Sequence, residues 1–197
     1  MSASASDPHV GLVVEGRGDL IALPIVLRLH LQATGEFRDV LGKPVPANGR
    51  DKALVPRGIE GYVATAAYRP GCVGVLVVLD GEGDAVCTLG PSLLVRATAK
   101  SRVPVRVALA DRDFEDWLYA SAETLGLGIV AYDPEQRGQA AIKSALRPRA
   151  YAKPVWQPKL AAKMDHGRAT ARNRSFARML QRFDELRELL PPTPGQD

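Results

Sequence analysis

The sequence predicts an α/β protein with a Rossmann-like, mainly parallel sheet flanked by helices and followed by a helical C-terminal extension. Residues 9–14, 72–79 and 103–110 are short, continuous apolar runs rich in valine. Such runs are typical of strands that are buried on both faces. Segments with helical spacing of apolar residues lie between and after these runs. The alternation of strand and helix favours a parallel sheet with right-handed crossovers.

The first connection is predicted to be a helix. Its apolar residues recur at helical spacing, at Leu20, Leu23, Leu27 and Leu31. We expect Asp19 to be its N-cap residue. Pro24 then has to fall in the first turn, where a missing N–H is tolerated.

The second connection is predicted to be more irregular. Residues 36–58 contain three prolines and several glycines, which indicates a ragged edge strand and an exposed loop. Residues 59–68 are expected to form a short helix that leads back into the sheet. After the second main strand, residues 92–99 are predicted to be helical.

The third strand is predicted to lead into an amphipathic helix ended by Gly126. Its apolar and small positions are Phe114, Trp117, Leu118, Ser121 and Leu125. Two short helices are expected at 139–146 and 158–165. A longer helix follows, with an apolar stripe at Phe176, Met179, Leu180, Phe183, Leu186 and Leu190. Its outer face is expected to carry Arg174, Arg178 and Arg182.

These elements suggest a simple domain organisation. The chain has 197 residues, enough for one domain with a substantial core and a small appendage. We expect a disordered tail at 1–8, an α/β domain at 9–136, a basic helical extension packed on it at 137–190, and a disordered tail at 191–197.

Composition excludes several classes of protein. No apolar run approaches the roughly 20 residues that span a bilayer, so no membrane association is expected. The N-terminal MSASASDP lacks the pattern of a signal peptide, which predicts a cytoplasmic location. Cys72 and Cys87 are not spaced as a C-x-x-C motif. We expect both to be reduced core residues, with no disulfide or zinc site.

Charge is distributed unevenly along the chain. Residues 1–142 carry 14 Lys/Arg against 17 Asp/Glu, and residues 143–190 carry 12 against 4, which gives net charges of −3 and +8. A basic segment beside an acidic site suits a polyanionic substrate. A solvated helical face would explain the same charges and is the simpler interpretation of charge alone.

Carboxylates follow the first two main strands at the point where each strand ends. Glu15-Gly16 follows the first, and Asp80-Gly81-Glu82-Gly83-Asp84 follows the second. In an open parallel sheet these ends meet at one edge, where ligands bind. Carboxylate oxygens are the ligands that Mg²⁺ or Mn²⁺ prefers, so the pattern predicts a hard-metal site suited to phosphodiester chemistry.

Other known motifs explain these acids less well. An EF-hand loop is excluded because residue 85 is alanine and the twelfth position is Pro91. A dinucleotide-binding loop is a weak match, since Gly16-Arg17-Gly18 is followed by Ile21 in place of the third glycine. Taken singly, each acid could equally be a helix cap or a turn residue. His9, His30 and His166 are scattered and predict no site.

The third strand adds the segment Asp111-Arg112-Asp113-Phe114-Glu115-Asp116-Trp117. Acids in the first turn of a helix are favoured by its macrodipole, which explains most of them without any function. Glu115 differs, because Phe114 and Trp117 flank it and would fix its direction. No aromatic platform for stacking bases is evident in the sequence.

These residues resemble the Toprim fold, the catalytic module of type IA and type II topoisomerases, bacterial primases and OLD-type nucleases. That family carries a glutamate after its first strand and a D-x-D after a later one, which match Glu15 and Asp80 with Glu82; the second acid here is Glu instead of Asp. The chain also resembles small stand-alone Toprim-like bacterial proteins of unknown function. Its matching segments are VVEG, VLVVLDGEGD, VALADRDFEDWLYAS, Lys143, Tyr151, Lys159-Leu160, Asp165 and Arg174-Ser175-Phe176.

The resemblance covers nearly the full chain, and FEDW is its most specific segment. Position 113 is usually glutamate in that group, so Asp113 is a conservative departure. The resemblance implies a metal-dependent nuclease, often encoded beside an ATPase in anti-phage defence. Glu15, Asp80, Glu82 and Asp84 would bind one or two Mg²⁺ or Mn²⁺ ions, and Glu115 would complete the site.

The expected partner is nucleic acid, DNA more than RNA, together with an ATPase and a possible second copy of the chain. Six basic residues are expected to contact phosphates: Lys52, Arg57, Lys143, Lys159, Arg174 and Arg178. Two alternatives remain open. The chain could be a non-catalytic interaction subunit of an ATPase complex, or an RNA-processing nuclease.

Overall fold

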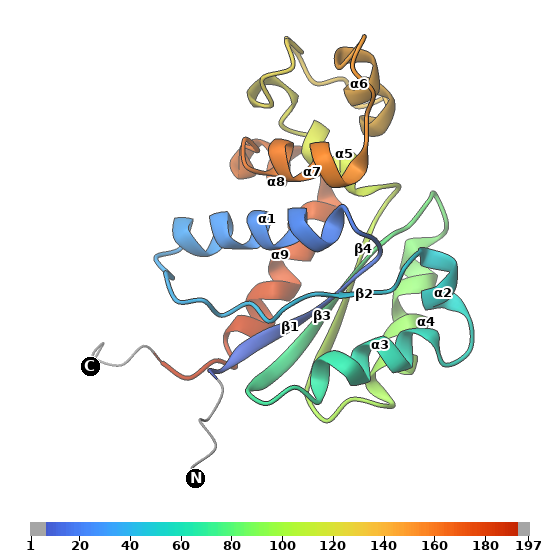
Figure 1. Ribbon diagram of the computed structural model, residues 1–197, viewed down its shortest axis with the longest axis vertical. Helices are drawn as coiled ribbons and strands as arrows, with labels where there is room; N and C mark the ends of the chain where they lie inside the picture. The colour runs from blue at the N-terminus through green and yellow to red at the C-terminus, as the bar shows by residue number, and fades with distance from the viewer. Residues whose placement is uncertain (1–6, 193–197) are drawn as a thin grey trace.

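The computed structural model describes residues 7–192 and contains a parallel sheet of four strands (Figure 1). The strands are β1 (His9–Val14), β2 (Val45–Pro46), β3 (Cys72–Asp80) and β4 (Val105–Ala110), in the order β2-β1-β3-β4. Val77 of β3 pairs with Val13 of β1 and with Val107 of β4. The predicted α/β class with a parallel sheet flanked by helices is confirmed.

The sheet is covered on both faces because successive strand residues point to opposite sides. Val13, Val77 and Val107 pack on one face with α3 (Gly58–Ala67) and α4 (Val86–Thr98). Leu12, Leu76 and Ala108 pack on the other face with α1 (Asp19–Ala33) and the C-terminal helices. Two cores therefore sandwich the sheet, as the continuous apolar runs predicted.

The first helix differs from prediction at its start. Gly18 is the N-cap residue of α1, and Asp19 is the first helical residue; its carboxylate accepts a hydrogen bond from Gly16 N at 3.0 Å. Pro24 lies in the second turn, where it is buried. Packing of this apolar face evidently outweighs the hydrogen bond that proline cannot donate.

The connection at 36–58 contains the two-residue strand β2 and a short helix, α2 (Arg50–Leu54), that the sequence did not predict. Helix α4 begins at Val86, six residues before the predicted start, with Pro91 inside it. The single helix expected after β4 is divided. It consists of α5 (Phe114–Tyr119) and a 3₁₀ turn, η1 (Ala122–Thr124), and Gly126 follows with φ +70°.

The C-terminal part forms α6 (Gly138–Ala145), α7 (Lys153–Ala161), α8 (His166–Arg172) and α9 (Arg174–Arg187). Helix α7 starts earlier than predicted, with a proline in its first turn, where the missing N–H costs nothing. Asp165 caps the unpredicted α8 by accepting from Arg168 N at 3.0 Å. Helix α9 buries its apolar stripe against β3 and β4.

One arginine on α9 departs from prediction. Arg182 does not lie on the outer face, because its guanidinium donates to the carbonyl of Val107 in β4. Burial accordingly lowers the pKa of Arg182. Arg174 and Arg178 are exposed as expected.

Helices α5 to α8 lie together at the end of the molecule toward which the strands run (Figure 1). We call them the helical cap. Helix α7 of the cap packs along α1, and α5 follows directly from β4. The cap therefore covers the carboxyl ends of the strands, where the sequence predicts the site.

Some remaining predictions concern the termini and cysteines. The tails predicted to be disordered, 1–8 and 191–197, fall largely on residues 1–6 and 193–197, outside the described range. Cys72 is buried, but Cys87 is exposed on α4, so its predicted core position is wrong. Across residues 7–192 no helix has the length and apolar character needed to cross a bilayer.

Candidate active site at the carboxyl ends of the strands

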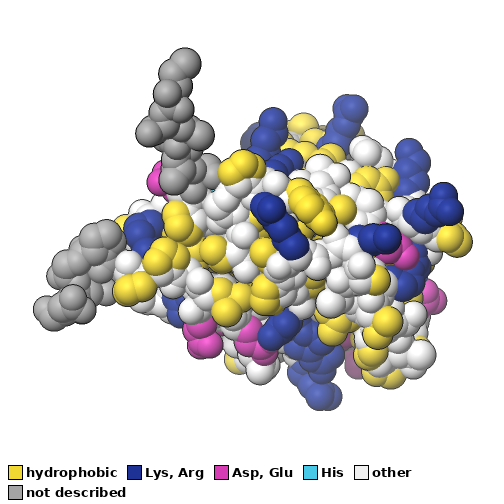
Figure 2. All heavy atoms as spheres, turned by 90° about the horizontal axis from the view of Figure 1, so that it is seen from below, with side chains coloured by type: hydrophobic (Ala, Val, Ile, Leu, Met, Phe, Trp, Pro, Cys, Tyr) yellow, Lys and Arg dark blue, Asp and Glu magenta, His cyan; other side chains and the backbone are white. Residues whose placement is uncertain are grey.

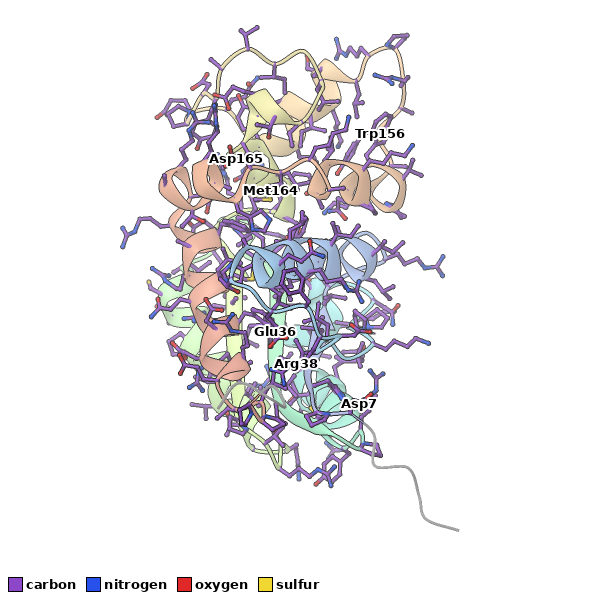
Figure 3. All side chains as sticks on the ribbon, turned by 90° about the vertical axis from the view of Figure 1, so that its left-hand side faces the viewer. Asp7, Glu36, Arg38, Trp156, Met164 and Asp165 are labelled. Atoms are coloured by element: carbon purple, nitrogen blue, oxygen red, sulfur yellow. The ribbon has the colours of Figure 1, made fainter. Side chains whose placement is uncertain are left out.

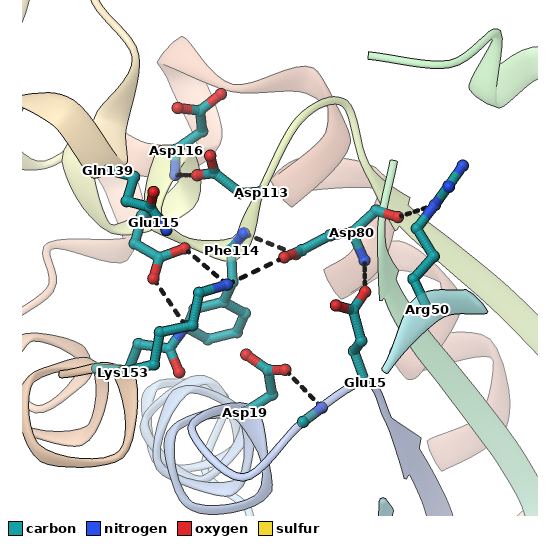
Figure 4. Close-up of polar contacts among 12 residues, drawn as sticks. Glu15, Asp19, Arg50, Asp80, Asp113, Phe114, Glu115, Asp116, Gln139 and Lys153 are labelled. Atoms are coloured by element: carbon teal, nitrogen blue, oxygen red, sulfur yellow. Dashed lines mark hydrogen bonds and ion pairs between the residues drawn. The ribbon is translucent and has the colours of Figure 1, made fainter. Parts of the chain in front are cut away.

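Two of the predicted acids meet at the edge of the sheet. Glu15 directly follows β1, and Asp80 is the last residue of the adjacent strand β3. The backbone N–H of Asp80 donates to Glu15 Oε2 at 3.0 Å. Asp19, the first residue of α1, stands beside them (Figure 4). Parallel pairing of β1 and β3 thus places these carboxylates together.

Glu115 joins the site from the first turn of α5 and is fully buried. Its Oε1 accepts hydrogen bonds from the hydroxyl of Tyr151 and from Gln157 Nε2, the latter at 3.1 Å. The backbone N–H of neighbouring Phe114 donates to Asp80 Oδ1 at 2.8 Å. The start of α5 is therefore held directly on the end of β3.

Lys153 supplies the positive charge between these acids. From the start of α7 its Nζ reaches Asp80 Oδ2 at 3.3 Å and Glu115 Oε2 at 3.5 Å (Figure 4). Sequence reasoning missed this residue. Its only signal was its place in the basic extension, which does not distinguish it from the other lysines there.

Burial controls the electrostatics of the cluster. Desolvation raises the pKa of Asp80 to about 8, against the lowering effect of Lys153, and raises the pKa values of Glu15 and Asp19. Burial by itself would lower the pKa of Lys153, but Asp80, Glu115 and Asp19 together raise it. One fixed cation thus faces an excess of carboxylates.

Glu82 and Asp84 are not drawn into this cluster. Both are exposed on the loop after β3, with side chains 59% accessible, and both pair with Arg50 of α2. Arg50 Nε also donates to the carbonyl of Asp80 at 3.1 Å. The structure therefore splits the four predicted metal ligands into an inner pair, the partly buried Glu15 and the buried Asp80, and an outer pair that binds Arg50.

The other acids after β4 have local structural partners. Asp113 is the N-cap of α5 and accepts from Asp116 N at 3.0 Å; burial raises its pKa to about 6. Asp116 binds Arg112 and accepts from Gly138 N at 2.6 Å. Asp111 is exposed. Capping and the helix macrodipole therefore account for Asp113 and Asp116.

A cleft opens from the buried cluster toward solvent. Its volume is about 290 Å³, and it lies between the loop after β3, the start of α5 and the cap. Asp80 and Lys153 form part of its wall, with Glu82, Arg112, Asp113, Arg137 and Gln139 around them. A phosphate group entering here would meet both carboxylates and cations.

The six basic residues expected to contact phosphates come from separate elements. Lys52 and Arg57 lie on and after α2, Lys143 on α6, Lys159 on α7, and Arg174 and Arg178 on α9, all exposed. Lys and Arg side chains also spread over the end of the molecule opposite the cap (Figure 2). Positive charge alone therefore does not mark one binding surface.

Two of the three histidines, for which the sequence predicted no site, border a larger groove of about 790 Å³ along α8 and α9: His30 and His166. His30 Nε2 lies 3.0 Å from the carboxylate of Asp184. Burial lowers the pKa of the His166 imidazole. This groove is lined by different residues from the cleft at the strand ends.

The donor chemistry of the buried cluster suits a hard divalent cation. Among residues 7–192, none donates a hydrogen bond to the buried oxygens Asp19 Oδ1 and Glu115 Oε2. The same residues include no group of three or more His, Cys, Asp or Glu side chains already close enough to hold a metal ion. Binding would thus require Glu15, Asp80 and Asp19 to draw together.

Comparisons of the chain with family models, with curated proteins and with solved structures found no match.

Proposed function

We propose that the protein is a Mg²⁺- or Mn²⁺-dependent nuclease that hydrolyses phosphodiester bonds of nucleic acid. The observation that carries the proposal is that Glu15 and Asp80, at the ends of the paired strands β1 and β3, are joined by a hydrogen bond, while Lys153 bridges Asp80 and the buried Glu115 of α5. Buried acids with raised pKa values and a single cation favour binding of further positive charge.

Glu15, Asp80 and Asp19 would hold the metal, which when bound polarises a phosphate and lowers the pKa of water. Lys153 would neutralise a phosphate oxygen from the side of the cleft, since its ammonium already lies at the wall. Glu115, with no route to solvent, would position Lys153. Glu82 and Asp84 would act at the rim.

The test is cleavage of a labelled oligonucleotide with Mg²⁺ or Mn²⁺ by the Glu15→Gln and Asp80→Asn variants. Each should lower the rate at least 10³-fold while the circular dichroism spectrum is retained, as expected for loss of a metal ligand. Glu188→Gln is the matched control, because Glu188 is an exposed carboxylate at the end of α9. Undiminished cleavage by both variants would refute the proposal.

A second candidate function is a non-catalytic interaction subunit. It is favoured by Lys153 itself, whose ammonium already compensates two of the carboxylates without a metal. Titration with Mn²⁺, followed by its electron paramagnetic resonance signal, separates the two. Binding that is lost in Glu15→Gln supports the nuclease, and absence of binding in the wild type supports the scaffold.

The wider setting follows from the resemblance to Toprim-like proteins and remains part of the proposal. It comprises a cytoplasmic location, an ATPase partner, a role in anti-phage defence, and DNA as the substrate in preference to RNA. Parallel assays with DNA and RNA oligonucleotides of the same sequence distinguish this role from RNA processing.

A further inference from the structure

The start of α7 carries an aromatic side chain next to the candidate site. Trp156 follows Lys153 by three residues, so the two lie on neighbouring positions of one helical surface. Its indole Nε1 donates to the carbonyl of Ala150 at 3.0 Å. This bond holds the ring between α7 and the loop that leads from α6 (Figure 3).

Two cations flank the Trp156 ring. The guanidinium of Arg149 lies 5.1 Å from the ring centroid, and Lys159 Nζ lies 5.1 Å from it. Both cationic side chains are exposed, and the indole is partly exposed. The surrounding segment, residues 136–164, contains seven Lys/Arg and no Asp or Glu. The ring therefore sits in a strongly positive environment.

Core packing accounts for only part of the Trp156 side chain, which lies partly buried against the main core. The other tryptophan, Trp117, is 1% exposed and donates to Ser175 Oγ at 2.8 Å within the core. Trp156 instead keeps part of its ring exposed, on the same helix as Lys153. The backbone connects this ring to the site, because Ala150 accepts the hydrogen bond from Trp156 and the next residue, Tyr151, donates its hydroxyl to Glu115.

We propose that Trp156, with Arg149 and Lys159, is a stacking site for an unpaired base of a single-stranded polynucleotide whose phosphate lies at the strand-end carboxylates. The placement of that phosphate at the carboxylates rests on the proposed nuclease function. A base inside a duplex has both faces covered by its neighbours, so a tryptophan can stack only on an unpaired base.

Stacking of a base on Trp156 is expected to be stronger than the cation–π contacts that the ring makes with Arg149 and Lys159. An exposed cation–π contact contributes about 0.5–1 kcal/mol, whereas stacking of one base on an aromatic side chain contributes about 1–3 kcal/mol. A base can therefore displace Arg149 or Lys159 from the ring. The displaced cation is then free to bind the adjoining phosphate.

Binding is measured in EDTA, without cleavage, by the anisotropy of a dye-labelled oligothymidylate and of a blunt duplex. Wild-type protein should prefer the single strand. Its tryptophan fluorescence should be quenched by unlabelled oligothymidylate, and the quenching reports on Trp156 because Trp117 is buried. Trp156→Leu, which keeps apolar bulk, should weaken single-strand binding roughly 5- to 150-fold.

Two further variants sharpen the result. Trp156→Phe keeps a ring and should restore most of the affinity. Tyr68→Ala is the matched control, because Tyr68 is 59% exposed and has Arg102 at 5.0 Å over its ring, on the far side of the sheet. It should bind like the wild type.

The inference is overturned if Trp156→Leu binds as tightly as wild type, or if duplex binds as well and quenches as strongly. The two proposals fail separately. Metal-dependent cleavage with unchanged binding by Trp156→Leu removes the stacking site and leaves the nuclease. Stacking without any cleavage removes the nuclease and leaves a single-strand-binding surface.

Discussion

Lys153 Nζ lies 3.3 Å from Asp80 Oδ2, across 73 residues of sequence. The contact joins the start of α7 to the end of β3, so the helical cap contributes a charge to the edge of the sheet. It also makes the cap and the strand-end acids electrostatically dependent on each other.

Replacing this lysine should destabilise the protein. In Lys153→Met the buried carboxylates lose their counter-ion, and breaking a buried pair costs about 3–5 kcal/mol. Because the Lys153 side chain is 37% exposed, we expect about 2–3 kcal/mol. Urea unfolding in EDTA at about pH 9, where Asp80 is ionised and Lys153 is still charged, measures the loss, and Mn²⁺ should restore part of it by replacing the charge.

Lys163→Met provides the matched control, since Lys163 is an exposed lysine shortly after α7. Its unfolding free energy should change by less than about 0.5 kcal/mol. Equal stability of Lys153→Met and wild type in EDTA would show that the ion pair has no structural importance.

Asp80 should make stability depend on pH. Its pKa is about 8 in the folded protein against an ordinary value of 3.8, so the folded state binds the proton more tightly. The stabilisation from this proton is fully present below the unfolded pKa and is lost as the pH rises through the folded pKa. The free energy of unfolding should therefore fall between about pH 4 and pH 8.

The amide side chain in Asp80→Asn cannot ionise, so this variant should lose less stability than wild type over that pH range. We expect the two losses to differ by about 1–3 kcal/mol, less than the full pKa shift implies, because water entering the site stabilises the ionised carboxylate. Urea unfolding at several pH values checks this. Glu36 and Glu123 have pKa values lowered to about 2 by Arg38 and Arg172, so they change the free energy of unfolding only at lower pH. Parallel pH profiles for Asp80→Asn and wild type would contradict the prediction.

The outer acids should matter less than the buried ones. Glu82→Ala and Asp84→Ala remove exposed carboxylates that pair with Arg50, and exposed pairs contribute about 0–1 kcal/mol. We expect each variant to lower kcat/KM no more than about tenfold, against at least 10³-fold for Glu15→Gln. Cleavage assays compare the variants directly. If Glu82→Ala and Asp84→Ala lowered kcat/KM as much as Glu15→Gln does, both residues would have to be metal ligands.

The meeting of Glu15 and Asp80 could be predicted because it depends only on strand order and parallel direction. Both acids end strands that pair side by side, so their positions follow from the sheet. The position of Glu82 and Asp84 apart from this pair could not be predicted, because it depends on Arg50 in a five-residue helix within a proline-rich connection. Short elements of this kind are set by tertiary contacts more than by local sequence.

Residues of the cap were the least predictable. Lys153 acquires its partners Asp80 and Glu115 only through tertiary packing of α7, which no local periodicity encodes. Glu115 was indicated by the aromatic residues that flank it, whereas its partners Tyr151 and Gln157 come from the cap. The acids of the site were thus predictable from the sequence, whereas the side chains that contact them from α7 and the loop before it were not.

The packing of α7 on α1 can itself be tested at Gly18, the N-cap of α1. Its φ of −67° suits any residue, so an added methyl group has only steric effects. In Gly18→Ala the new Cβ would collide with the Gln157 side-chain amide and lie 3.0 Å from Lys153 Cβ. Because Gln157 binds Glu115, either the Gln157 amide must rotate and give up that hydrogen bond or α7 must shift, and both disturb the site. We expect a loss of about 1–3 kcal/mol of stability from overpacking.

Cleavage by Gly18→Ala should fall as well, although no charged residue has changed, because Lys153 and Glu115 are displaced together. Gly61→Ala is the control. It lies inside α3 with open space around its added Cβ, and should be neutral or stabilising by up to about 1 kcal/mol. Urea unfolding and the oligonucleotide assay are run on both variants. If Gly18→Ala kept full activity, the placement of α7 by α1 would not govern the site, and the nuclease chemistry would rest on the strand-end acids alone.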